Sequence, residues 1–148
     1  MNVEKKKSKK RFAASFEPPH RPVVLYLDRN LGKHVIAETL RAAGHSVEIH
    51  DDHLPINAPD EDGIALVARK GWLAITKDKN IRYRFAEIET IKESRAKVLV
   101  VRAKNATGRE IADLFINAMS TIQKFAQTVA APFVCGVDRS GRITRYEV

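Results

Sequence analysis

The sequence predicts an α/β fold built on a central, mainly parallel sheet. Short apolar runs of strand length alternate with segments of helical periodicity along most of the chain, which is the pattern of βαβ units. The run at residues 23–27 is apolar throughout, as expected of a strand buried on both faces. Two final strand-like segments, joined by the turn at 138–141, predict an antiparallel C-terminal hairpin.

In the first half we expect a strand at 23–27, a helix at 31–43, a strand at 46–49, a helix at 59–70 and a strand at 72–76. The helix at 31–43 carries apolar residues at three- and four-residue spacing, which makes one face apolar. Asn30 is expected to cap that helix, and Gly44 is expected to end it.

In the second half we expect a weakly amphipathic helix at 82–94, a strand at 97–102, a long helix from Thr107 to Val129, and hairpin strands at 133–137 and 143–146. The strand is apolar enough to be central in the sheet. Thr107 and Glu110 form a capping-box signature, and Pro132 ends the long helix.

The composition is that of one globular domain of 148 residues with 44% hydrophobic residues and a single cysteine, Cys135. No apolar run reaches the roughly 20 residues that cross a bilayer, and no secretory signal is evident, so we expect a cytoplasmic protein without membrane contact. Residues 1–21 hold seven bases and two acids, so their charge is +5 of the net +8. We expect a disordered basic tail there, either solubilising or loosely holding a phosphate backbone.

Three acids follow strands or open helices at the predicted β-to-α connections: Asp28, Asp60 and Asp78. Parallel topology brings such connections to one edge of the sheet. Carboxylates about 5 Å apart repel by roughly 3 kcal/mol at an effective dielectric near 20, so the group needs a shared proton or a divalent cation such as Mg²⁺ or Mn²⁺. The alternative is structural, with Asp60 as a helix cap and Asp78 in an Asx turn.

Basic residues follow the third acid closely: Lys77, Lys79, Arg82 and Arg84. They could hold RNA phosphates, with Tyr83 available to stack a base, or they could simply solvate a helix end. The histidines and acids at 50–53 could bind a transition metal, but a solvated loop is the simpler interpretation. No glycine-rich phosphate loop and no Gly-x-Ser-x-Gly elbow are present, which argues against nucleotide cofactors and serine hydrolase chemistry.

Residues 23–102 resemble the PIN-domain nucleases, and more closely the PIN-like toxins of bacterial VapBC toxin–antitoxin systems, in the VapC45-like branch. The segments that carry the resemblance are 25–31, 58–62 and 71–81, and the closing hairpin is also similar. The resemblance implies a PIN-like three-layer α/β/α domain, here at 22–148. It also implies a metal-dependent endoribonuclease that a cognate antitoxin blocks, with a homodimer as a further hypothesis.

Carried over by position, the resemblance makes Asp28, Asp60 and Asp78 the catalytic, metal-binding acids. Further helpers would be Asn30, Glu61, Asn80 and Glu87. Many PIN domains have another acid where this chain has Asn80, and this difference motivates a second hypothesis, a PIN-like binding or regulatory module that does not cut. A phosphatase of the haloacid dehalogenase type is weaker, because its nucleophile motif needs an acid at the position of Asn30.

Overall fold

The computed structural model describes residues 23–32 and 34–148. The basic tail predicted at 1–21, and with it the predicted domain start at residue 22, lies outside these described residues. Within them, no helix combines the length and the apolar character needed to span a membrane.

The described residues form one six-stranded sheet with the strand order β2-β1-β3-β4-β5-β6. The strands are β1 (Leu25–Leu27), β2 (Val47–Ile49), β3 (Leu73–Thr76), β4 (Lys97–Arg102), β5 (Phe133–Asp138) and β6 (Ile143–Tyr146). All neighbouring pairs are parallel except β5 and β6, which form the antiparallel hairpin. The predicted mainly parallel sheet and C-terminal hairpin are therefore confirmed.

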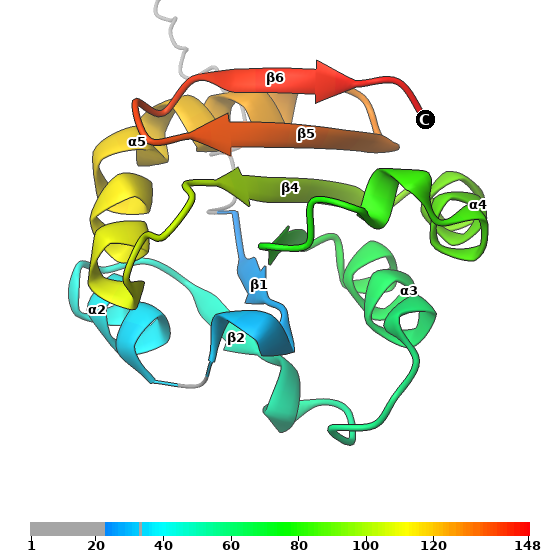
Figure 1. Cartoon of the computed structure of the whole chain (residues 1–148), viewed down its shortest axis with the longest axis horizontal. Coiled ribbons are helices and arrows are strands. Elements are labelled where there is room, and N and C mark those ends of the chain that lie inside the picture. The colour runs from blue at the N-terminus through cyan, green and yellow to red at the C-terminus, as the bar shows by residue number, and fades with distance from the viewer. Residues whose placement is uncertain (1–22, 33) are drawn as a thin grey trace, which may run out of the picture.

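Helices cover both faces of this sheet (Figure 1). The helices are α2 (Val35–Ala42), α3 (Asp60–Lys70), α4 (Phe85–Ser94) and α5 (Gly108–Thr128). One apolar core joins α2 and α5 to the sheet, and a second joins α3 and α4 to the opposite face. The two cores separate because successive strand residues point to opposite faces, so Leu25 and Leu27 enter the first core and Tyr26 the second. The predicted three-layer α/β/α fold is confirmed.

The first helix begins later than predicted. A 3₁₀ turn, η1 (Arg29–Leu31), follows β1, and α2 begins only at Val35. The prediction that Asn30 caps a helix is wrong, because Asp28 caps η1 by accepting a hydrogen bond from the Arg29 amide. The predicted end is correct: Gly44 has φ +94°, and its amide donates to the Arg41 carbonyl at 2.9 Å.

The helix predicted at 82–94 is divided into a 3₁₀ turn, η3 (Ile81–Tyr83), and α4. A further 3₁₀ turn, η2 (His50–Asp52), lies in the predicted loop after β2. The predicted capping box of the long helix is present, with Thr107 and Glu110 bonded reciprocally.

The sheet has a topological switch point between β1 and β3. The chain leaves β1 through α2 on one face to reach β2, and returns through α3 on the other face to β3, on the far side of β1. Leu27 pairs with Ile75, and the Asp28 amide donates to the Ile75 carbonyl at 2.9 Å, so Asp28 lies beside Thr76. Crevices at such switch points are where open α/β sheets bind their ligands.

Candidate metal centre

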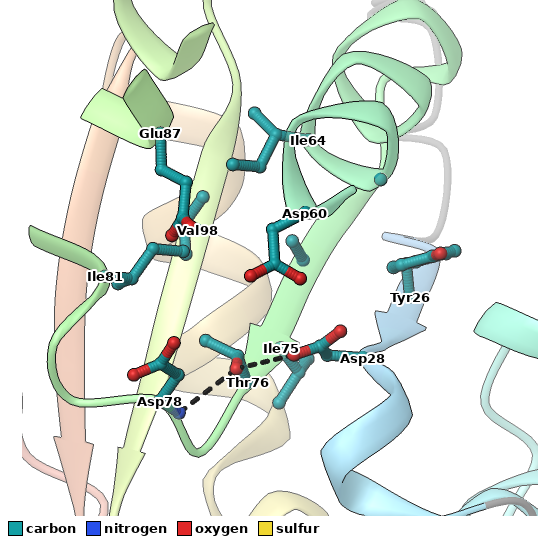
Figure 2. A pocket seen from close by; sticks show the side chains of 12 residues that line it. Tyr26, Asp28, Asp60, Ile64, Ile75, Thr76, Asp78, Ile81, Glu87 and Val98 are labelled. Atoms are coloured by element: carbon teal, nitrogen blue, oxygen red, sulfur yellow. Dashed lines mark hydrogen bonds between the residues drawn. The ribbon is translucent and has the colours of Figure 1, made fainter. Parts of the chain in front are cut away.

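Three carboxylates meet at the carboxyl edge of the sheet. Asp60, Asp78 and Glu87 each offer an oxygen, and these oxygens lie within 4.8 Å of one another. Asp60 is the first residue of α3, Asp78 follows β3, and Glu87 lies in the first turn of α4. Figure 2 shows their side chains facing one pocket, which Asp28 and Tyr26 also line. Segments far apart in the sequence therefore bring acids to one place.

Helix direction explains how two of these acids reach the edge. Both α3 and α4 begin at the carboxyl ends of the strands, so Asp60 and Glu87 stand at helix N-termini. The partial positive charge of a helix N-terminus favours a carboxylate there. The prediction that Asp60 is a helix cap is wrong, because Pro59 occupies the cap position and makes no side-chain cap bond.

Asp28 lines the same pocket but is not one of the three oxygens that cluster most tightly. Its carboxylate accepts two hydrogen bonds, from the Thr76 hydroxyl at 2.9 Å and from the Arg29 amide at 2.8 Å. The predicted trio of Asp28, Asp60 and Asp78 thus lines one pocket. The group of three oxygens within 4.8 Å contains Glu87, predicted only as a helper, in place of Asp28.

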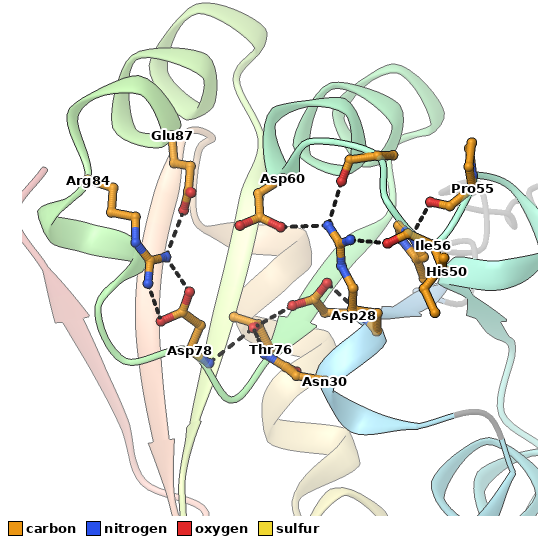
Figure 3. Close-up of polar contacts among 12 residues, drawn as sticks. Asp28, Asn30, His50, Pro55, Ile56, Asp60, Thr76, Asp78, Arg84 and Glu87 are labelled. Atoms are coloured by element: carbon orange, nitrogen blue, oxygen red, sulfur yellow. Dashed lines mark hydrogen bonds and ion pairs between the residues drawn. The ribbon is translucent and has the colours of Figure 1, made fainter.

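Thr76 connects the acids, and sequence reasoning did not find it. Its hydroxyl donates to Asp28 and accepts from the Asp78 amide at 3.1 Å and the Asn30 side-chain amide at 3.1 Å (Figure 3). All three hydrogen-bonding sites of a hydroxyl are therefore used, in a residue that is 3% exposed. A hydroxyl at the last position of a strand, two residues before an acid, is the signal that could have indicated this role.

The predicted helpers differ in their positions. Asn30 braces the loop after β3, since its carbonyl also accepts from the Lys77 amide at 3.3 Å. Asn80 donates its backbone amide to Asp78 at 3.0 Å, which is the Asx turn considered for Asp78. Glu61 follows Asp60 on α3 but does not line the pocket. The structure thus favours Asp60 over Glu61 at this position.

Two arginines pair with the acids, and Figure 3 shows Arg84 against Asp78 and Glu87. Arg29 bonds Asp60 at 2.8 Å, the Ala58 carbonyl at 2.7 Å and the Ile56 carbonyl, so it ties η1 to the loop that delivers Asp60. Arg84 contacts both carboxylate oxygens of Asp78 and also Glu87 at 3.3 Å. Within the described residues, the charges of all three clustered acids are therefore opposed by guanidinium groups.

Burial and neighbouring charges shift the pKa values of three side chains in or beside the pocket: Tyr26, Arg84 and Glu87. Desolvation and the nearby charge of Asp60 raise the pKa of Glu87 above its usual range, and Arg84 opposes the shift. The hydrogen bond from Arg84 to Asp78 raises the pKa of the arginine, so its charge is permanent. Burial, aided by Asp28, raises the pKa of Tyr26 to about 12, so this phenol stays protonated at neutral pH.

Tyr26 and His50 lock the loop that leads to α3. The Tyr26 hydroxyl lies 2.9 Å from Nδ1 of His50, and Nε2 of His50 lies 3.1 Å from the Pro55 carbonyl. The carbonyl can only accept, so Nε2 donates to it, and in that tautomer Nδ1 accepts from the Tyr26 hydroxyl. His53 lies 2.7 Å from Glu48. The two histidines thus have separate partners, and they form no shared metal-ligand group in the described part of the chain.

The predicted RNA-binding residues lie in three different settings. Arg84 is engaged with the acids, and Arg82 stacks over the rings of Tyr146 and Tyr83 at 4.2 and 4.6 Å. Lys77 and Lys79 line a separate groove beside the pocket. Only Arg84 of these four therefore contacts the acidic cluster directly.

The three carboxylates fit a divalent cation. An all-oxygen donor set suits Mg²⁺ or Mn²⁺. The three oxygens lie within 4.8 Å of one another, so the side chains of Asp60, Asp78 and Glu87 would have to draw closer together to hold a single ion. In this structure the guanidinium of Arg84 supplies the positive charge that opposes Asp78 and Glu87.

Comparison with known proteins agrees with this geometry. The family model described as a PIN-like domain matches residues 23–103, more than half of the chain. The chain is also 27% identical over 120 residues to the putative ribonuclease VapC45 of Mycobacterium tuberculosis, covering 78% of this chain and 86% of that protein. No solved structure gives a significant match.

Proposed function

The chain belongs to the PIN-like domain family, and from this premise we propose that it is a metal-dependent endoribonuclease that hydrolyses RNA phosphodiester bonds. The observation that carries the proposal is the convergence of Asp60, Asp78 and Glu87 on one pocket at the switch point of the sheet. The similarity to a protein named as a ribonuclease supports the substrate class. The acids supply the hard oxygen ligands that phosphodiester hydrolysis by Mg²⁺ or Mn²⁺ requires.

In this mechanism Asp60, Asp78 and Glu87 hold the ion, with Asp28 at the wall of the same pocket. A divalent ion bound there supplies a water of lowered pKa and neutralises charge on the phosphate. Thr76 keeps Asp28 and the Asp78 loop in fixed positions through its three hydrogen bonds. Arg84 pairs with Asp78 and Glu87 on the rim of the pocket, so an ion held by these two acids would release its guanidinium to donate to a phosphate oxygen.

We further propose that the protein acts in the cytoplasm as the toxin of a toxin–antitoxin pair. The support is its likeness to VapC45 together with the resemblance of segments 25–31, 58–62 and 71–81 to VapBC toxins. Co-expression of an antitoxin encoded beside the gene of this chain should restore growth that this chain inhibits. Light scattering should report whether the chain alone is a homodimer. Unchanged growth on expression of the chain alone would contradict the toxin role.

A cleavage assay tests the nuclease. We expect the wild type to cut a labelled single-stranded RNA with Mg²⁺ or Mn²⁺ and not with EDTA. Asp78→Asn should lose about 100-fold or more of that activity, because the change removes a ligand charge. Asp113→Asn is the matched control, since Asp113 is exposed on α5 and pairs with Arg109. Equal cleavage by the wild type and Asp78→Asn would rule out this mechanism.

The second candidate is a PIN-like module that binds but does not cut. Two observations favour it. Arg84 already pairs with Asp78 and Glu87, and Asn80 stands where many PIN domains have a further acid. Thermal melting with Mn²⁺ distinguishes the two, because a ligand at 100 times its dissociation constant stabilises by about 2.7 kcal/mol. A shift in the wild type that Asp78→Asn loses supports the nuclease, and no shift at any concentration supports the second candidate.

A further inference from the structure

A basic groove lies next to the acidic pocket, on the other side of the loop after β3. Four bases line it: Lys77, Lys79, Arg102 and Lys104. They come from the carboxyl ends of β3 and β4, which are neighbours in the sheet (Figure 1). No acidic side chain of the described residues lines this groove. A cluster of positive charge in the groove therefore lies beside a cluster of negative charge in the pocket.

The loop after β3 serves both cavities. Lys77 and Lys79 flank Asp78 in the sequence, yet Asp78 lines the acidic pocket while the two lysines line the groove. A polymer bound in the groove would therefore contact Lys77 and Lys79, the two residues that flank Asp78 of the acidic cluster in the sequence. Arg102 and Lys104, from the β4–α5 connection, complete the groove and were not found by sequence reasoning.

The four bases are available to a ligand. All four are exposed, and none of them forms an ion pair within residues 23–32 and 34–148. Arg29 and Arg84, in contrast, are held by carboxylates in the acidic pocket. Unpaired like charges close together repel one another, so the groove gains stability when an anion enters it.

The wall formed by the β4–α5 connection is structured. Arg139, in the turn of the β5–β6 hairpin, donates to the Lys104 carbonyl at 2.6 Å. The Ala106 amide donates to the Ala103 carbonyl at 3.1 Å, and Asn105 has φ +62°. These bonds define the course of the backbone between Arg102 and α5 without using the Lys104 side chain. The position of the groove is thus set by the fold before any ligand binds.

We propose that this groove binds the sugar-phosphate backbone of single-stranded RNA and leads it to the acidic pocket. The inference rests on the proposed nuclease function for its substrate class. Lysine and arginine contacts to phosphates position a nucleic acid but do not read its sequence. The groove therefore sets affinity and the path of the strand, and it does not set the preferred cleavage sequence.

The salt dependence of RNA binding gives the size of the expected effect. Each phosphate neutralised on a single strand contributes about −0.7 to the slope of log affinity against log salt. Replacing two groove bases should therefore flatten the slope by about 1.4. If the electrostatic contribution vanishes near 1 M salt, the same loss weakens binding about 60-fold at 50 mM salt.

The test is fluorescence anisotropy of a labelled oligouridylate with the full-length protein in EDTA, which prevents cleavage. The groove variant is Arg102→Gln/Lys104→Gln. The matched control is Lys92→Gln/Lys124→Gln, which removes two exposed bases from α4 and α5, outside the groove. We expect the affinity of the groove variant for the oligouridylate to fall by several tens of fold, and that of the control variant to fall by less than threefold. Unfolding curves establish that both variants fold.

Equal losses in the two double variants would overturn the groove, because binding would then depend only on total charge. No loss in the groove variant would also overturn it, even if the wild type cleaves RNA with Mn²⁺. If the wild type cleaves nothing while the groove variant still loses affinity, the nuclease proposal fails and the groove stands. The same comparison is made with a blunt duplex RNA. If the groove substitutions weaken binding of the duplex as much as binding of the single strand, the assignment of single-stranded RNA is overturned.

Discussion

The acidic pocket and the basic groove lie on either side of one loop, but their charges are treated differently by the fold. In the pocket, Asp60, Asp78 and Glu87 are all paired with arginines, and Thr76 uses every hydrogen-bonding site of its hydroxyl. In the groove, the bases have no ion-pair partner among the described residues. The pocket therefore keeps its geometry without a ligand, whereas the groove presents positive charge that a ligand can neutralise.

The largest effect on stability is expected from Thr76→Val, which keeps the shape of the side chain and removes the hydroxyl. Asp28 loses a donor, and the Asp78 amide and the Asn30 side chain lose an acceptor, all close to a buried position. We expect a loss of about 3 kcal/mol, because unsatisfied buried polar groups cost about 1–3 kcal/mol each and do not add fully. Urea unfolding measures it, with Thr121→Val on the exposed face of α5 as control. A change below 0.5 kcal/mol would show that the pocket does not depend on this network.

The next largest effect is expected from Arg29→Met, which keeps the apolar stem and removes three donated bonds. The loop before α3 loses its contacts at Ile56 and Ala58, and Asp60 loses its counter-charge. We expect a loss of about 2 kcal/mol, in the range for hydrogen bonds of charged groups. Arg69→Met, at an exposed position of α3, is the control in the same urea assay. Equal stability of the two variants would mean that Arg29 does not hold the loop.

Glu87→Gln tests the pocket through pH. The pKa of Glu87 is raised in the folded state, so the folded protein binds its proton more tightly than the unfolded chain does. Its contribution to stability is therefore full below the unfolded pKa and is lost as pH rises through the raised value. We expect the glutamine variant to lack this fall in stability between acidic and neutral pH. The check is urea unfolding at several pH values without metal; parallel profiles for both proteins would contradict it.

The smallest effect on stability is expected in the groove. Arg102→Gln/Lys104→Gln should change the free energy of unfolding by less than about 0.5 kcal/mol, because these exposed side chains form no ion pair with any residue that the structure describes. The same variant should lose RNA affinity strongly. A stability loss of 2 kcal/mol would show that these bases support the fold and would remove the contrast between the two regions.

Sequence reasoning predicted the alternation of strands and helices because apolar periodicity is a local property of the chain. It also predicted Gly44 as a helix end and Thr107 with Glu110 as a capping box, since both signals lie within a few residues. It failed at Asn30, whose side chain bonds Thr76 across 46 positions of sequence. A cap preference is weak when a distant partner offers the same hydrogen bonds.

The order of residues along the chain determined which acids could stand at the carboxyl ends of the strands, because strand direction and right-handed crossovers follow from local pattern. Only the tertiary structure decided which of them cluster. Packing of α3 beside α4 brought Glu87 to Asp60 and Asp78, and the strand register placed Asp28 against Thr76 instead. Distances of a few ångströms between side chains depend on how helices pack on the sheet, and no periodicity in the sequence encodes that packing.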